Sequence, residues 1–224
     1  INNIMCYSVE SSIRTTTISF LSIIYLLTSG IPHFQWIGVA LIGWCGMQFD
    51  ELLLWLTNPR KGCTTWNKTS TMSLIPFTLF SQPIFALWGA LYVFPWKKLT
   101  QLNKQFMILY TIMCAIIIYF IHFTNIEKVC TKVTNMGHLD WSTSDYNYIF
   151  PCIWTIVIIL PILIFWNKSY LLIIAICVLP LFGFFYGKLK TDSHGSIWCY
   201  YTSYSSVISV IALFLYKNNI YNIL

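Results

Sequence analysis

The sequence has few charged side chains: only 9% of its 224 residues are Asp, Glu, Lys or Arg, whereas 57% are hydrophobic. A soluble domain carries about 25% charged residues, so a soluble globule of this size is disfavoured. Disorder is excluded as well, because a disordered chain needs low hydrophobicity and high charge. The class that remains is a polytopic α-helical membrane protein.

Several motifs of enzymes and binding proteins are also missing. The sequence contains no P-loop, no Rossmann glycine pattern and no GxSxG nucleophile motif. It has no CxxC, HxxxH or HExxH spacing, so we predict neither a metal site nor a cofactor. The net charge of +6 is spread over the loops. We therefore expect the lipid bilayer as partner and no nucleic acid, and leave a homo-oligomer open.

Seven apolar runs approach the roughly 20 residues that a helix needs to cross a bilayer. We expect spans at residues 13–28, 34–56, 73–96, 105–123, 148–166, 170–186 and 200–216. These runs are apolar on all sides, which favours helices over the alternating strands of a membrane barrel. The sequence predicts an all-α fold over residues 1–224, a single bundle of seven transmembrane helices. It shows no internal repeat of the kind found in many transporters.

With seven spans the two termini lie on opposite faces of the membrane. We call face A the side of the N-terminus and of the loops after spans two, four and six. Lys and Arg are somewhat more frequent on face A, which would place it in the cytoplasm. However, the acidic residues and four of the cysteines also gather there. We give the cysteines more weight and predict that face A is lumenal or extracellular and the C-terminus cytoplasmic.

Four cysteines on face A, one in each loop or terminus, indicate two disulfides in an oxidising compartment. We predict the pairs Cys6–Cys199 and Cys63–Cys130. The first pair requires the first and last spans to be neighbours. The second ties the loop after span two to the long loop at residues 124–147. Unpaired thiols or a metal site are the alternatives.

Asp50 and Glu51 are the only acids within an expected span. Charges inside a membrane are costly, so they usually face the bundle interior and serve a purpose. Gln48 and Glu51 fall on one helical face, whereas Asp50 points about 100° away, toward the headgroups. In the functional interpretation, Glu51 binds a cation, a proton or a polar group. Alternatively it is a structural carboxylate satisfied by Arg14 or by aromatic donors.

Further polar residues lie in the half of the membrane nearest face A. Gln82 precedes Pro83 near the middle of span three, and either lines a kinked cavity or bonds to another helix. The polar start of span seven offers partners for Glu51. A stripe of hydroxyls farther along that span indicates helix packing or a cavity wall: Thr202, Ser205, Ser206 and Ser209. The candidate binding or pore residues are Arg14, Gln48, Glu51, Gln82, Ser196 and Trp198. No catalytic residue is assigned.

Five short motifs occur in order: Met5-Cys6-Tyr7-Ser8, Met47-Gln48 followed by Glu51 and Trp55, Cys63 with Asn67, Gln82-Pro83, and Gly195-Ser196-Ile197-Trp198-Cys199. With them the chain resembles an uncharacterised multi-pass membrane protein family of giant DNA viruses, with relatives in protists and algae. The resemblance runs from Met5 to about Ser203, and Asp50 beside Glu51 departs from it. It implies a seven-span bundle, in a virion or a host endomembrane, but no established activity.

The favoured hypothesis is a channel or transporter for an ion or small solute, with Glu51 as its key polar group. A structural component of a membrane, such as a virion's inner membrane, is the first alternative. The second is a membrane-embedded lipid-modifying enzyme that uses Glu51 with His122, His138 or Asp140, which we favour less. A continuous water-filled path would favour the channel or transporter, and a dry packed bundle would favour the structural component. A lateral cleft lined by a carboxylate and a histidine would favour the enzyme.

Overall fold

The computed structural model describes residues 8–123, 130–135, 137–141, 149–166, 171–190 and 194–220. Within them the chain forms seven α-helices, three short 3-10 helices and one two-stranded sheet. The α-helices are α1 (Val9–Leu27), α2 (Pro32–Leu56), α3 (Thr65–Gly89), α4 (Gln101–Phe123), α5 (Ile149–Phe165), α6 (Leu171–Lys190) and α7 (His194–Lys217). The short elements are η1 (Pro59–Lys61), η2 (Ala90–Tyr92), η3 (Trp96–Lys98), β1 (Lys132–Val133) and β2 (Leu139–Asp140).

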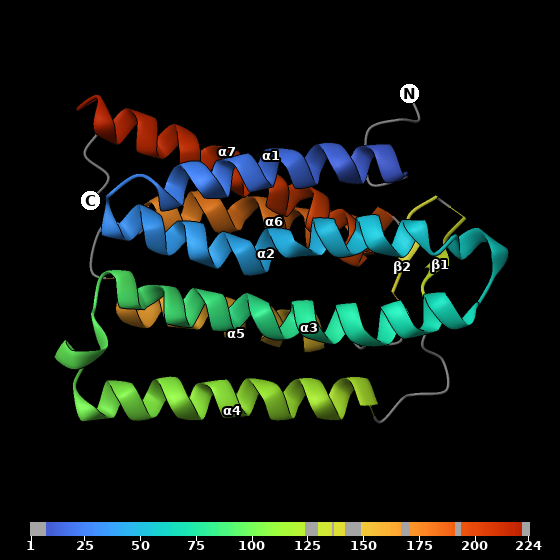
Figure 1. The fold of residues 1–224 in the computed structure, drawn as a ribbon, viewed down its shortest axis with the longest axis horizontal. Helices are drawn as coiled ribbons and strands as arrows, with labels where there is room; N and C mark the ends of the chain where they lie inside the picture. The colour runs from blue at the N-terminus through green and yellow to red at the C-terminus, as the bar shows by residue number, and fades with distance from the viewer. Residues whose placement is uncertain are drawn as a thin grey trace.

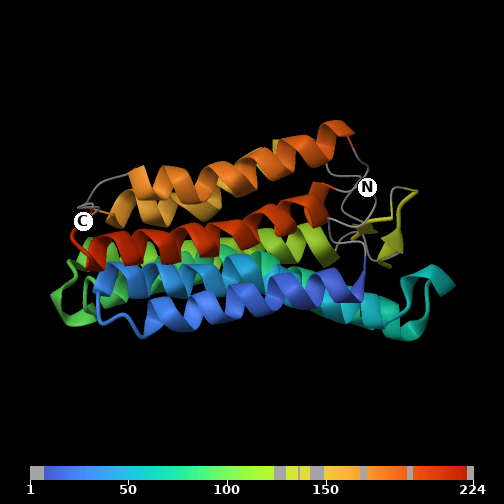
Figure 2. The same cartoon turned by 90° about the horizontal axis from the view of Figure 1, so that it is seen from above.

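Consecutive helices run in opposite directions, so that the chain passes back and forth between two ends of the bundle (Figure 1). α1, α2, α3 and α4 pack in sequence order, α7 packs on α1 and α2, α6 packs on α7, and α5 packs on α3. Figure 2 shows α6 on the opposite side of the bundle from α1 and α3. The turn between α2 and α3 and the small sheet lie at one end, which is face A (Figure 1). α1 and α7 are neighbours, as the pair Cys6–Cys199 requires.

Among the described residues, four helical segments are long and apolar enough to cross a membrane: residues Pro32–Leu56, Thr65–Tyr92, Gln101–Phe120 and Ile197–Lys217. This confirms the all-α class and gives four candidate spans, whereas the sequence predicted seven. α5 supplies only a shorter apolar helix, Ile153–Phe165. In α1 a row of hydroxyl side chains lowers the apolar character, and several of them are buried.

The helix ends explain why α3 begins eight residues before the predicted span. The Thr64 hydroxyl caps this helix by accepting a hydrogen bond from the Asn67 backbone N–H at 3.1 Å. α2 begins at Pro32, and proline suits the first turn of a helix because no intrahelical partner awaits its missing N–H. α3 thus continues past its apolar run, and its polar first turns extend toward face A.

The outer surface has the features of a lipid-facing bundle. Large apolar side chains are exposed on α1, α4 and α5, among them Phe20, Leu109 and Ile156. Near the end opposite face A, the Lys104 ammonium lies 5.7 Å from the Trp96 ring centre and the Lys217 ammonium 5.5 Å from the Tyr25 ring centre. At face A, the Arg60 guanidinium lies 5.9 Å from the Trp55 ring centre. Aromatic rings beside cations are typical of both membrane interfaces.

The hydroxyl stripe of α7 packs the bundle. Thr202, Ser205, Ser206 and Ser209 are all buried. The Thr202 hydroxyl donates to the Trp198 carbonyl at 2.8 Å, and the Ser209 hydroxyl to the Ser205 carbonyl at 2.8 Å. Such bonds satisfy the side chain within its own helix and let a neighbouring helix approach closely. This geometry supports the packing interpretation of the stripe.

Part of the long segment predicted as a loop at residues 124–147 forms a compact hairpin. β1 and β2 pair antiparallel, with Lys132 opposite Asp140. β1 contacts η1 and β2 contacts α7, so the hairpin lies across the face A end of the bundle (Figures 1 and 2). We call residues 130–135 and 137–141 the face A hairpin.

Candidate functional site

The two acids of α2 lie in its last turns before face A, and both are buried. Glu51 is 0% exposed and Asp50 is 6% exposed. The burial of Glu51 agrees with a side chain that points into the bundle. The burial of Asp50 differs from the prediction that it reaches toward the headgroups. The reason is that α3 and the face A hairpin extend beside the end of α2 and enclose it.

Asp50 lines a narrow void between α2 and α3. Its walls are Met47, Asp50, Ile75, Thr78, Leu79 and Trp141. Trp141 follows β2, so the face A hairpin inserts this ring beside the carboxyl group of a membrane helix. Within the part of the chain that the structure describes, neither Asp50 Oδ2 nor Trp141 Nε1 has a hydrogen-bond partner. Two residues with a buried polar atom that has no partner in this described part thus line the same small void.

Gln48 connects α2 to α1. It is fully buried, and its Oε1 accepts a hydrogen bond from the Thr15 hydroxyl at 2.6 Å. Arg14, the predicted partner of Glu51, is placed elsewhere. Its guanidinium forms an ion pair with Glu10, one turn earlier on α1, and its side chain is 73% exposed. A local partner at i−4 on the outer face is available without burying the guanidinium, so the structure does not bring Arg14 to Glu51.

Gln82 joins three helices near the middle of the bundle. Its Nε2 donates to the Met47 sulfur on α2, and its Oε1 accepts from Trp154 Nε1 on α5 at 3.3 Å. It also lines a cavity of about 30 Å³, together with Trp44, Trp198 and Thr202. A second cavity of about 10 Å³ lies between Trp44 and Trp166. These volumes hold about two water molecules and one, respectively.

The structure therefore brings Gln82 and Trp198 to one cavity and leaves Asp50 in a separate void. Ser196 lies in the first turn of α7, but its side chain is outside the described part. His122 is likewise at the end of α4 with its side chain outside that part. Among the described residues, no group of three or more His, Cys, Asp or Glu side chains is placed to hold a metal ion.

The predicted disulfide Cys63–Cys130 is confirmed. It joins the turn before α3 to the start of the face A hairpin. Cys6, by contrast, lies outside the described residues, so the pair Cys6–Cys199 stays a prediction. Cys199 is buried near the start of α7.

A buried hydrogen-bond network beside this disulfide was missed from the sequence. Asn67 Nδ2 donates to the Thr131 carbonyl at 2.9 Å, and the Thr131 N–H donates to Asn67 Oδ1 at 3.0 Å. The Thr71 and Thr131 hydroxyls lie 2.8 Å apart. In the sequence Asn67 stands out only beside Cys63 and as the acceptor of the glycosylation sequon Asn67-Lys68-Thr69. The i, i+4 spacing of Asn67 and Thr71 is the one local signal of the network. With its amide buried and bonded, Asn67 cannot carry a glycan in this fold.

His138 is a second buried polar residue of the hairpin. It is fully buried at the turn before β2, outside the membrane-spanning segments. Burial lowers its pKa from 6.5 to about 4, because the charged imidazolium loses its hydration. His138 is therefore neutral near pH 7.

Comparison of the chain with known protein families, with curated proteins and with solved structures finds no match.

Proposed function

We propose that this multi-pass membrane protein moves protons or small cations through a site formed by Asp50 and Glu51. The observation that carries the proposal is the burial of two adjacent carboxylic side chains inside a helix that is long and apolar enough to span a membrane. An ionised acid costs about 2.5–3.5 kcal/mol at the centre of a membrane helix on insertion scales, and burial within the bundle keeps Asp50 and Glu51 from water although they lie nearer the end of α2. Such residues therefore mark proton relays and ion pathways far more often than ordinary packing positions.

The proposal includes a topology. All seven helices cross the membrane, and face A is the lumenal or extracellular side. The alternating direction of consecutive helices supports the first statement. The Cys63–Cys130 disulfide supports the second, because disulfides persist in oxidising compartments.

The conformation described here is closed. The two cavities beside Trp44 hold about three water molecules together, and the void at Asp50 has no room for one. Transport then requires a rearrangement that hydrates Asp50, as expected of a protein that alternates between closed and open states.

The test is proton flux in proteoliposomes that contain a pH-sensitive dye and an imposed potassium potential. We expect wild-type protein to dissipate the gradient, and Asp50→Asn or Glu51→Gln to slow it by about 100-fold, the usual effect of losing a proton-transfer group. Glu10→Gln is the matched control, since Glu10 is an exposed acid paired with Arg14, and it should conduct like wild type. Folded wild-type protein that conducts no faster than empty liposomes would refute the proposal.

A structural membrane component is the second candidate, and the small volume of the cavities favours it. Membership of the giant-virus family would place such a component in a virion or host endomembrane. Under this hypothesis the acids only hold the bundle, so Glu51→Gln lowers the melting temperature and no wild-type flux exists. A lipid-modifying enzyme receives less support, because none of the cavities described above is lined by both a carboxylate and a histidine.

A further inference from the structure

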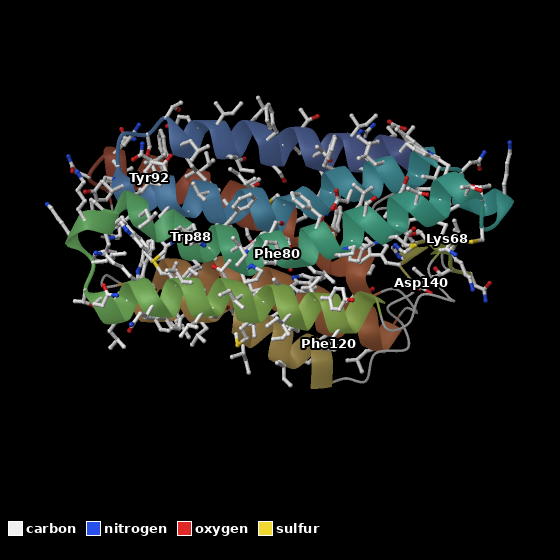
Figure 3. The ribbon with its side chains drawn as sticks, turned by 60° about the horizontal axis from the view of Figure 1, so that its bottom comes forward. Lys68, Phe80, Trp88, Tyr92, Phe120 and Asp140 are labelled. Carbon is white, nitrogen blue, oxygen red and sulfur yellow. A yellow bond between two sulfur atoms is a disulfide. The ribbon has the colours of Figure 1, made fainter. Side chains whose placement is uncertain are left out.

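The face A hairpin is buried like a core element, although it lies outside the helices. Thr131, His138, Leu139 and Trp141 are all buried. Figure 3 shows Asp140 of β2 at the same end of the bundle as Lys68 of α3, and opposite Tyr92. The hairpin thus covers the end of the helix pair that carries the two acids.

Two different anchors hold the two ends of this hairpin. At its start, Cys130 is bonded to Cys63, and Thr131 is bonded to Asn67 and Thr71 of α3. These contacts join it to the turn between α2 and α3 and to the first turns of α3. At its other end, Trp141 reaches the void beside Asp50. The start is fixed by a covalent bond and by hydrogen bonds to α3, whereas Trp141 lies in the wall of the void between α2 and α3.

The chemistry at the Trp141 end is complementary. The void between Trp141 and Asp50 excludes water. Asp50 Oδ2 is an acceptor and Trp141 Nε1 is a donor, and each has no partner within the described residues. Buried polar groups are costly to leave without a hydrogen bond, so a hydrogen bond between these two groups would remove the cost for both.

We propose that Trp141 is the gate residue of the Asp50 site. A small rotation of its side chain from the described position lets its indole N–H donate to the Asp50 carboxyl group and secure the closed state, in which its ring blocks the path from face A. To open the site, the Trp141 end of the hairpin swings away, while the Cys63–Cys130 disulfide retains the hairpin near the bundle. Water, with a proton or a cation, then replaces the indole N–H. This inference rests on the proposed function, since it names how access to the same site is controlled.

The gate is tested by accessibility, a measurement that needs no transport. The reporter is Asp50→Cys in proteoliposomes, labelled from face A with a charged, water-soluble maleimide. Labelling is followed by the mass of the peptide that contains position 50. We expect slow labelling in the single variant, and labelling at least about tenfold faster once Trp141→Ala is added, because the local opening equilibrium shifts.

Two further variants make the test specific. Trp141→Phe keeps an aromatic ring at the void, and the carboxyl acceptor is already absent from the Asp50→Cys reporter, so its labelling should stay as slow as in the single variant. Trp66→Ala is the matched control, because Trp66 is a 64% exposed tryptophan near the same end of α3, and it should leave the rate unchanged. The gate is refuted if Trp141→Ala labels at the rate of the Trp66→Ala control.

The outcome is separable from that of the proposed function. If wild-type protein shows no flux and Trp141→Ala still accelerates labelling, the gate stands and transport fails. If Asp50→Asn abolishes flux and Trp141→Ala leaves labelling slow, transport stands and the gate is overturned. Where Trp141→Ala fails to fold, Trp141→Leu serves in its place, because it removes the ring but keeps a larger apolar side chain. Its folding is checked by its elution profile, and labelling at the control rate would again refute the gate.

Discussion

The backbones of α2 and α3 approach each other closely at Gly43, and this contact offers a quantitative test of the fold. A Cβ atom at Gly43 would lie 2.6 Å from the Ser81 carbonyl oxygen and 3.0 Å from the Gln82 Cα atom. These are backbone atoms, so no side-chain rotation relieves the contact. The helices must separate, and a gap of about 0.5–1 Å already forfeits a quarter to a half of the dispersion energy at each contact. We expect Gly43→Ala to lower the free energy of unfolding by about 1–3 kcal/mol.

The same helix provides a matched control at Gly46. A Cβ atom there meets nothing within 4 Å. Gly46→Ala should therefore be neutral, or stabilise the helix by up to about 1 kcal/mol, since alanine is the better helix former. Thermal unfolding in detergent, followed by circular dichroism, should place Gly43→Ala about 2–12 °C below wild type and Gly46→Ala at or above it. Equal melting temperatures for the two variants would show that the α2–α3 contact is not as described.

Three further predictions concern the face A hairpin. Asn67→Asp keeps the acceptor for the Thr131 N–H but loses the donor to the Thr131 carbonyl. Amide hydrogen exchange should show the hairpin destabilised by about 1–3 kcal/mol. Lys68→Ala, which alters an exposed neighbour, should show no change. Replacing both Cys63 and Cys130 by Ser removes a cross-link between residues 67 positions apart. The melting curve should show that the free energy of unfolding falls by up to about 4 kcal/mol, the value from the loop-entropy relation. Unchanged stability would contradict the anchoring role of the disulfide. The pKa of His138 in the folded protein, about 4, is below the value of 6.5 for an unburied histidine, so the unfolded state takes up the proton first as pH falls. The free energy of unfolding should therefore fall as pH drops from 6.5 toward 4, by at most about 1.4 kcal/mol per pH unit. The melting temperature of His138→Gln should lack this pH dependence, and identical pH profiles for the two proteins would contradict the prediction.

Apolar runs in the sequence were sufficient to locate the helices. The predicted spans at 34–56 and 105–123 agree closely with α2 (Pro32–Leu56) and α4 (Gln101–Phe123). The Cys63–Cys130 pair was also predictable, because cysteines on one face of a membrane protein have few partners to choose from. Apolarity does not reveal where a helix continues outside the membrane. α3 starts at Thr65 because of a cap and a network with Thr131, which are polar contacts between distant segments.

The environment of the acids depended on such contacts and was not predictable. A helical wheel of α2 places Asp50 on a different side of the helix from Glu51. With α2 considered alone, nothing covers that side, so Asp50 was predicted to reach toward the headgroups. The structure fills that side with α3 and with Trp141, which is 91 positions farther along the chain. The prediction that Arg14 pairs with Glu51 was wrong because of a local contact, not a distant one. Glu10, one turn earlier on the exposed face of α1, forms the ion pair with Arg14.

The buried polar groups of the bundle differ in what they require from their surroundings. A buried hydroxyl such as Ser22 of α1 or Ser209 of α7 donates to a carbonyl of its own helix, so it can be buried at little cost. A carboxylate only accepts, and the N–H groups of a helix interior are already bonded to carbonyls one turn earlier. Asp50 therefore needs a donor from another element, a proton or a cation. In the proposed closed state Trp141 supplies that donor, so the hypotheses of transport and of gating both depend on this one side chain.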